Sequence, residues 1–179
     1  HRFKRGYKNV INEAIRLNQE GINCPLAIET SGHAALRENY FLDDGAYLVT
    51  KIIIKMAQLK KEGKTLESLL APESVEVRMP ILTEDFRACG EQVISGLEAY
   101  AKVHDGWQIA PDNHEGIRVS FGKDEGDGWF LLRLSVHDPI MPLHIESDAV
   151  GGVKLIAGKL YDYVKTVENV DISALEKIL

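Results

Sequence analysis

The second half of the sequence alternates apolar and polar residues in a way that is typical of a β-strand with one solvated face. Between Val75 and Ile81 an apolar side chain occupies every second position, and charged residues lie between most of them. An extended backbone places these two sets on opposite faces. Further strands are predicted at residues 107–109, 117–121, 129–135 and 141–146. We expect an antiparallel sheet with one face against a core and one face in water.

Helices are predicted to cover the buried face of this sheet. Thr83 is expected to cap the first helix, with Glu84 and Asp85 in the first turn complementing the helix dipole, and a second helix begins near Asp148. Their apolar positions recur at helical spacing: Phe86, Val93, Leu97 and Tyr100 in the first, and Val153, Ile156, Leu160 and Val164 in the second. Strands and helices around one antiparallel sheet make an α+β domain.

The first part of the chain has a different pattern. A helix is predicted over residues 9–20 with Gly21 as its C-terminal cap, followed by a strand at residues 24–28. Asp44 starts a long helix that ends at Gly63, and a short helix is expected over residues 65–71. The inward stripe of the long helix is predicted to be Leu48, Ile52, Ile53, Met56 and Leu59. The best linker candidate is Pro72-Glu73-Ser74.

Charge and composition exclude some classes of function. The formal net charge is −6 and the pI is near 5.5, which disfavours a role in binding nucleic acid or an anionic membrane. No apolar run approaches the roughly 18 residues of a membrane-spanning helix. Cys24 and Cys89 are far apart in sequence and lie in apolar contexts, as expected for buried free thiols in a reducing compartment. We therefore expect a cytoplasmic protein.

The first candidate site is the run from Ala27 to His33, where an apolar strand gives way to polar residues. Glu29, Ser31 and His33 alternate, so an extended backbone would direct all three side chains to one side. Their donors, acceptors and titratable imidazole suit a ring of sugar hydroxyls. The alternative is that Glu29 faces solvent, Ser31 forms a turn and His33 caps a helix.

The second candidate site is the stretch from Arg133 to Pro139, where a predicted strand runs out into a loop. An arginine fork with the Ser135 hydroxyl two residues later supplies the charge and directed donors that phosphate binding needs. Alternatively, Arg133 is an outward residue of an amphipathic strand. The acidic run at residues 124–128 lacks the spacing of a calcium loop and is predicted to be a hairpin turn.

Three segments of the sequence resemble motifs of the α-D-phosphohexomutases, the phosphoglucomutase and phosphomannomutase family. The run Glu29-Thr30-Ser31-Gly32-His33 resembles the family's G-E-x-S-G-H sugar-recognition motif, with Ile28 in place of the leading glycine. Residues 4–8, Lys-Arg-Gly-Tyr-Lys, resemble K-V-G-x-[KR]. Residues 133–139 resemble the R-x-S-[GN]-T-E-P phosphate loop at Arg133, Ser135 and Pro139, with Asp138 a near match. The three segments occur in the family's order.

The resemblance implies a fold class and a set of site residues. Residues 1–72 would be the C-terminal part of the family's third domain, which is α/β, and residues 73–179 its fourth domain, which is α+β. Within the third domain, Glu29 and Ser31 would hold sugar hydroxyls, His33 would orient them or assist proton transfer, and Lys4 would lie near the substrate. Within the fourth, the side chains of Arg133, Ser135 and His137 would clamp the distal phosphate.

The phosphate loop also departs from the family pattern. Val136 and His137 replace a small or amide residue and a threonine, and Pro142 stands where a second arginine often lies. A protonated His137 would donate to phosphate and make binding sensitive to pH. Alternatively, the loop has drifted to a different ligand.

The activity implied by the resemblance is the interconversion of hexose 1-phosphate and hexose 6-phosphate. A phosphoserine donates to the sugar, a hexose 1,6-bisphosphate turns over, and Mg²⁺ bridges the moving group. The serine loop T-A-S-H-N-P and the magnesium loop D-x-D-x-D-R of the family are absent from this sequence. The chain also lacks an initiator methionine and a signal peptide. We therefore expect the C-terminal half of such a protein, inactive alone, whose partners are the missing N-terminal domains and a hexose phosphate.

Several choices stay open from the sequence. Glucose, mannose and N-acetylhexosamine phosphates all fit the motif, and closure of two domains around the sugar is a further hypothesis. The basic residues at the start of the chain, Arg2, Lys4, Arg5 and Lys8, form a local positive patch or a solvated terminus. The alternative function is a non-catalytic module that binds a sugar phosphate or a protein partner.

Overall fold

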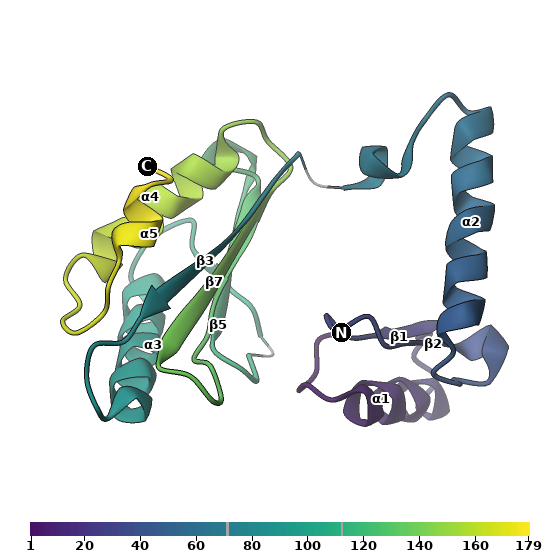
Figure 1. Ribbon diagram of the computed structural model, residues 1–179, viewed down its shortest axis with the longest axis horizontal. Coiled ribbons are helices and arrows are strands. Elements are labelled where there is room, and N and C mark those ends of the chain that lie inside the picture. The colour runs from purple at the N-terminus through teal and green to yellow at the C-terminus, as the bar shows by residue number, and fades with distance from the viewer. Residues whose placement is uncertain (71, 112) are drawn as a thin grey trace. The chain divides into compact units, whose positions relative to one another are not determined.

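The computed structural model describes residues 1–70, 72–111 and 113–179 (Figure 1). The chain divides into two compact units, His1–Leu70 and Ala71–Leu179. In the first unit the helices and strands are α1 (Tyr7–Gln19), β1 (Leu26–Ile28), β2 (Ala34–Leu36), the 3₁₀ turn η1 (Arg37–Asn39), α2 (Gly45–Lys61) and the 3₁₀ turn η2 (Leu66–Leu69). Residue 71, the last of the predicted short helix at 65–71, lies outside the described residues.

The first unit has a small core between α1 and a two-stranded hairpin. Strand β1 pairs antiparallel with β2, with Ala27 opposite Ala35. The core consists of Ala14 from α1 together with these two alanines. The Asn18 side chain donates to the carbonyls of Ala14 and Cys24, at 2.7 Å in both cases. This amide therefore ties the end of α1 to the segment that enters β1.

Helix α2 begins where the sequence predicts, but its predicted inward stripe is wrong. The Asp44 carboxylate accepts from the backbone N–H of Tyr47 at 3.0 Å and caps the helix. Leu59 is buried, whereas the side chains of Ile52, Ile53 and Met56 are 40%, 58% and 48% exposed. The helix contacts the rest of its unit mainly at β2. The apolar face is therefore present, but in this unit it lies largely open.

The second unit is built on a five-stranded antiparallel sheet in the order β3-β7-β6-β5-β4. The strands are β3 (Glu73–Pro80), β4 (Gln108–Ile109), β5 (Ile117–Phe121), β6 (Gly128–Leu132) and β7 (Ile140–Ser147). Each predicted strand is confirmed, although β6 ends at Leu132 and not at Ser135. Residues 124–127 of the acidic run lie in the β5–β6 connection, which contains the 3₁₀ turn η3 (Lys123–Glu125), and Gly128 begins β6, so the predicted hairpin turn is confirmed.

Three helices, α3 (Phe86–Lys102), α4 (Gly152–Val164) and α5 (Ser173–Glu176), lie on one side of this sheet (Figure 1). Between the layers, Phe130, Met79, Leu97, Ile156 and Leu160 are fully buried. Burial of a side chain of this size contributes about 1.5–3 kcal/mol. The α+β arrangement predicted for the second part of the chain is confirmed.

In the second unit, the starts of α3 and α4 differ from the prediction. The cap of α3 is Asp85 and not Thr83, because the Asp85 carboxylate accepts from the backbone N–H of Ala88 at 3.1 Å. Helix α4 starts at Gly152, and the Glu73 carboxylate accepts from the N–H groups of Gly151 at 2.6 Å and Val153 at 2.9 Å. A side chain distant in sequence thus performs the capping that a local residue usually provides.

Both cysteines are free thiols, as predicted. The prediction that they are buried is wrong, because both are partly exposed. Among the described residues, no helix is both long enough and apolar enough to cross a membrane.

Candidate functional site

The polar run after β1 folds into the turn of the β1–β2 hairpin. The Glu29 N–H donates to the His33 carbonyl at 2.9 Å, and the Gly32 N–H donates to the Glu29 carbonyl at 2.9 Å. Gly32 has φ +92°, as expected where a three-residue hairpin loop needs a left-handed position. The expectation of one extended strand is therefore wrong. Ser31 lies in the turn, while Glu29 and His33 face each other across the hairpin and share one side of it.

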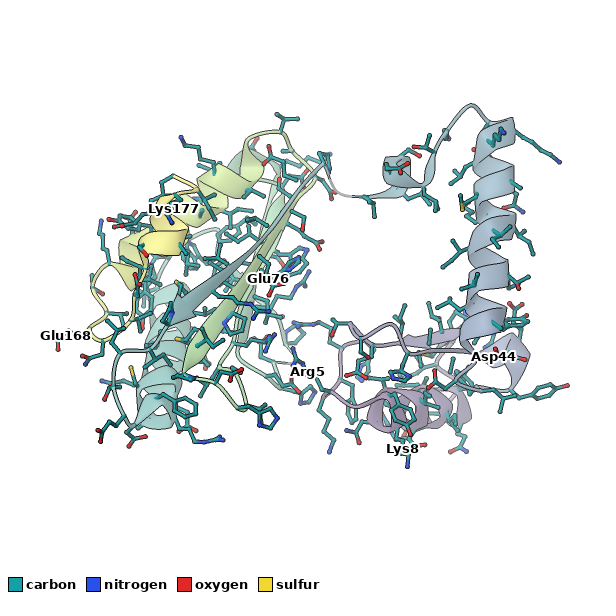
Figure 2. The ribbon with its side chains drawn as sticks, in the orientation of Figure 1. Arg5, Lys8, Asp44, Glu76, Glu168 and Lys177 are labelled. Carbon is teal, nitrogen blue, oxygen red and sulfur yellow. The ribbon has the colours of Figure 1, made fainter. Side chains whose placement is uncertain are left out.

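The segment of residues 4–8 meets this turn directly. The Gly6 N–H donates to Glu29 Oε1 at 3.2 Å. The Tyr7 ring stacks on the His33 imidazole, with centroids 4.9 Å apart and planes at 24°. Figure 2 shows Arg5 and Lys8 on either side of the point where α1 begins. Two of the three sequence motifs thus form one cluster in the first unit.

His33 has a second fixed contact on the side of α2. Its Nδ1 lies 2.6 Å from Asp43 Oδ2, and Asp44, the neighbouring residue, marks the start of α2 in Figure 2. A carboxylate at Nδ1 fixes the imidazole orientation and favours the tautomer that leaves Nε2 as an acceptor. His33 precedes β2 and no helix, so the alternative that it caps a helix is wrong.

Lys4 and Ser31, the other predicted sugar ligands of this unit, are both exposed. Lys4 Nζ lies 5.8 Å from the centroid of the Phe3 ring. Nearby, Lys51 of α2 pairs with Glu38 at 2.5 Å, and this hydrogen bond lowers the pKa of the Glu38 carboxyl. The pair ties α2 to η1, which directly follows the hairpin.

In the second unit, the predicted phosphate loop is the connection between β6 and β7. The Arg133 N–H donates to the Pro142 carbonyl at 3.1 Å, and the Ser135 N–H donates to the Ile140 carbonyl at 3.0 Å. The Ser135 hydroxyl oxygen accepts from the Asp138 N–H at 3.3 Å. These bonds keep the loop ladder-like up to Ser135 and leave a short exposed tip.

The side chains of this loop differ in exposure. Arg133 and Ser135 are half-buried, and Val136 and His137 at the tip are exposed. Pro142 is buried within β7, opposite Arg78. Pro142, one of the three departures from the family pattern, is therefore part of the sheet and is shielded from solvent.

Helix α3 contacts the predicted phosphate loop through residues that the sequence analysis missed. Arg87 Nη2 donates to the Val136 carbonyl at 2.8 Å. A Cβ on Gly90 would lie 2.5 Å from Leu134 Cδ1, so the helix and the loop are closely packed there. Arg87 is 49 residues from Val136 in the chain, and no local pattern could have linked them. By contrast, Tyr7, which stacks on His33, lies inside the motif of residues 4–8 and could have been selected from the sequence.

The described residues do not fit a Mg²⁺ site. In the ranges 1–70, 72–111 and 113–179, no group of three or more His, Cys, Asp or Glu side chains could hold a metal ion. The hairpin turn offers a carboxylate, a hydroxyl and an imidazole as hydrogen-bonding groups, and the β6–β7 loop offers a guanidinium and a hydroxyl.

Comparison with known proteins links both units to one family. The profile of phosphoglucomutase/phosphomannomutase, alpha/beta/alpha domain III, matches residues 1–74. A phosphoglucomutase of Neisseria gonorrhoeae is 28% identical over 135 residues, which are 75% of this chain and 28% of that protein. A phosphomannomutase/phosphoglucomutase of Pseudomonas aeruginosa is 26% identical over 147 residues, 80% of this chain and 29% of that protein.

The fold is shared with a solved structure. The crystal structure of a phosphoglucomutase/phosphomannomutase family protein from Burkholderia thailandensis has a TM-score of 0.61 and 24% sequence identity, over 93% of this chain and 32% of that one. The chain thus spans less than a third of the length of these relatives. The predicted fold class, α/β followed by α+β, is confirmed. Residues 1–74 thus match the domain III model of the phosphoglucomutase/phosphomannomutase family, and about three quarters or more of the chain is similar in sequence to phosphoglucomutases and phosphomannomutases of this family.

Proposed function

We propose that this chain provides the sugar-binding and phosphate-binding surfaces of a phosphosugar mutase that interconverts hexose 1-phosphate and hexose 6-phosphate. The observation that carries the proposal is the cluster at the β1–β2 turn. There Glu29, Gly6, Tyr7 and His33 hold one another in place, within the part of the chain that matches domain III of the family. Names of relatives add support, because they are phosphoglucomutases and phosphomannomutases.

In this proposal the hairpin turn binds sugar hydroxyls. The Glu29 carboxylate accepts from them, the Ser31 hydroxyl donates or accepts, and Lys4 attracts the anionic substrate. Asp43 holds His33 with Nε2 available to accept a proton from a hydroxyl or to orient it. These groups bind and position the sugar, and positioning accounts for most of the catalysis in phosphoryl transfer.

The β6–β7 loop binds the phosphate that does not react. Arg133 supplies a guanidinium fork, and the Ser135 hydroxyl keeps its O–H as a donor because its oxygen already accepts from Asp138. His137, at the exposed tip of the loop, adds a ring N–H as a further donor to the phosphate. A phosphoserine, Mg²⁺ and hexose 1,6-bisphosphate would enter the reaction of the whole protein. The described residues of this chain supply no metal site.

The test is a titration of the chain with glucose 1-phosphate, mannose 1-phosphate and N-acetylglucosamine 1-phosphate, followed by amide chemical shifts in two-dimensional NMR. We expect shifts at residues 29–33 and 133–139, loss of the first set in Glu29→Gln and of the second in Arg133→Ala. Absence of shifts at both loops with millimolar ligand would overturn the proposal. The sugar that gives the largest shifts at the hairpin turn identifies the substrate.

A coupled assay addresses turnover separately. We propose that the chain alone does not convert glucose 1-phosphate to glucose 6-phosphate, because its sequence contains neither the serine loop nor the aspartate loop of the family. Turnover by the pure chain that is lost in Glu29→Gln would overturn this part of the proposal and leave the binding roles intact.

A second candidate function is a non-catalytic module that binds a sugar phosphate or a protein partner. The exposed tip formed by Val136 and His137 favours it, because an apolar side chain that is 57% exposed contributes nothing to anion binding. If hexose phosphates shift neither loop, the module that binds a protein partner is the function that stands.

A further inference from the structure

We propose that Arg87 of helix α3 is a second cationic ligand and a positioning residue of the β6–β7 phosphate loop. The inference deepens the proposed function and rests on the phosphate role of residues 133–139. It concerns a residue outside every motif of the sequence, brought to the loop by the fold of the second unit alone.

The contact between Arg87 and the loop is specific. Arg87 Nη2 donates to the Val136 carbonyl at 2.8 Å, and Val136 directly follows Ser135. A guanidinium has five N–H donors in a planar fork. Within the described residues the structure records a single hydrogen bond from this one, so most of its donors are available to an anion at the loop.

The surroundings of Arg87 keep its charge uncompensated. It forms no ion pair with any described carboxylate, and its side chain is exposed. Asp85 lies two residues earlier, but its carboxylate is directed to the backbone N–H of Ala88. The guanidinium carbon lies 5.5 Å from the centroid of the Phe86 ring, a cation–π distance that restricts the orientation of the arginine.

The position in the helix also argues for a role beyond stability. Arg87 is in the first turn of α3, where the helix dipole is positive and a cation is unfavourable. The Asp85 carboxylate already caps this helix start, so the positive charge that α3 places next to the loop carrying Arg133 is the guanidinium of Arg87.

The chemistry of the ligand explains why a second cation matters. A phosphate monoester carries a charge of about −1.5 to −2 at pH 7, and a single guanidinium neutralises only part of it. Contacts from two arginines on different elements also fix the orientation of the phosphate, because each fork is planar and rigid. The close approach of Gly90 to Leu134 holds helix and loop at a constant spacing.

The experiment is a titration of the full chain with inorganic phosphate and with glucose 1-phosphate, observed by NMR at two salt concentrations. The variants are Arg87→Gln, Arg87→Lys, Arg133→Ala and Lys102→Gln. The last removes an exposed cation at the opposite end of α3, where Lys102 pairs with Glu98 at 2.6 Å. It controls for net charge and for the helix itself.

We expect Arg87→Gln to raise the Kd for both probes by about tenfold, Arg87→Lys to recover part of this loss, and Lys102→Gln to leave the Kd unchanged. The salt dependence of the Kd should weaken in Arg87→Gln, since one charge contact is lost. A merely structural role would lower the melting temperature without changing the salt dependence, and that result would overturn the proposal.

Failure of this inference is distinguishable from failure of the proposed function. If Arg133→Ala weakens phosphate binding while Arg87→Gln behaves like Lys102→Gln, the phosphate loop stands and Arg87 has no part in it. If the unsubstituted chain does not bind phosphate at the loop, both fall together. Should Arg87→Gln not fold, Arg87→Lys decides, because lysine keeps the charge and loses the planar fork, so an Arg87→Lys Kd identical to that of the unsubstituted chain would contradict the proposed contact.

Discussion

The imidazole of His33 and the carboxylate of Asp43 lie 2.6 Å apart, from Nδ1 to Oδ2, and join the β1–β2 turn to the start of α2. Asp43→Asn should therefore change the tautomer of His33 and leave α2 intact. Long-range ¹H–¹⁵N NMR of the ring nitrogens measures this directly. Asp44→Asn is the matched control, since asparagine caps helices as well as aspartate does. An unaltered ring spectrum in Asp43→Asn would mean that the carboxylate does not set the tautomer.

Glu73 makes the second unit sensitive to acid. Hydrogen bonds from the backbone N–H groups of Gly151 and Val153 lower the pKa of its carboxyl from the ordinary 4.5. The stabilisation is therefore full above that ordinary pKa and is lost as pH falls through the lower folded value. In melting curves between pH 3 and 6, Glu73→Gln should flatten the acid-side decline. Glu76→Gln, on the same strand, should retain the decline, and equal curves for the two variants would contradict the assignment.

Tyr163 should be among the last tyrosines to ionise. Its hydroxyl donates to the Val93 carbonyl at 2.8 Å, and burial raises the pKa of the phenol above 10. In an alkaline absorbance titration, Tyr163→Phe should remove a high-pH component. Tyr40→Phe, at a side chain that is 88% exposed, is the control and should leave this high-pH component in place. Loss of an early component in Tyr163→Phe would refute the prediction.

Gly116 lies where β5 begins and the backbone of β6 passes close by. It has φ +82°, and a Cβ there would meet the Leu132 carbonyl oxygen at 2.1 Å and Arg133 Cα at 2.7 Å. Gly116→Ala should lower the free energy of unfolding by about 1–3 kcal/mol and disturb the start of the phosphate loop. Urea unfolding checks the first effect. Gly122→Ala, where no atom lies within 4 Å of the added carbon, should be nearly neutral.

The open face of α2 predicts an asymmetric response to substitution. Ile53→Gln, at a side chain 58% exposed, should change the stability of the first unit by less than about 0.5 kcal/mol. Leu59→Ala, at a side chain 2% exposed, should cost about 2–5 kcal/mol. Circular dichroism during urea unfolding measures both. A large loss in Ile53→Gln would mean that the face is covered in solution.

Local sequence patterns predicted most of the second unit, because its strands alternate apolar and polar residues and its two long helices, α3 and α4, have apolar residues at helical spacing. The alternation from Val75 to Ile81 and the helical spacing of Val153, Ile156 and Leu160 both reflect burial against one core. All the apolar positions of these two patterns are buried except Val75, which is partly buried. Strand β2 was not predicted, because its Ala-Ala-Leu sequence is short and alanine has a weak preference for strands. Helix α5 was not predicted, because its four residues are too few to show a helical period.

Periodicity shows that a helix face is apolar and does not show what covers it. This is why the stripe of α2 was predicted to be inward although Ile52 and Met56 are exposed. The same limit applies to the candidate site, where the sequence shows which residues are polar and does not show their contacts. Glu29, Ser31 and His33 could be selected from the sequence, but the turn at Gly32 and the contacts from Gly6 and Asp43 depend on tertiary structure. The binding roles of the selected residues stay predictions until the titrations are made.

The end of β3, the first strand of the second unit, is hydrogen-bonded to residues near the opposite end of that unit. The Leu82 N–H donates to the Asn169 carbonyl and the Asp171 N–H donates to the Pro80 carbonyl, each at 2.8 Å, while Leu175 is fully buried in the shared core. During synthesis on a ribosome, these hydrogen bonds at the end of β3 can therefore form only after almost the whole unit has emerged. Because contacts so distant along the chain form late, this unit should fold only once residues 169–175 have emerged, whereas the hairpin of the first unit, with its partners close in sequence, can form much earlier in translation.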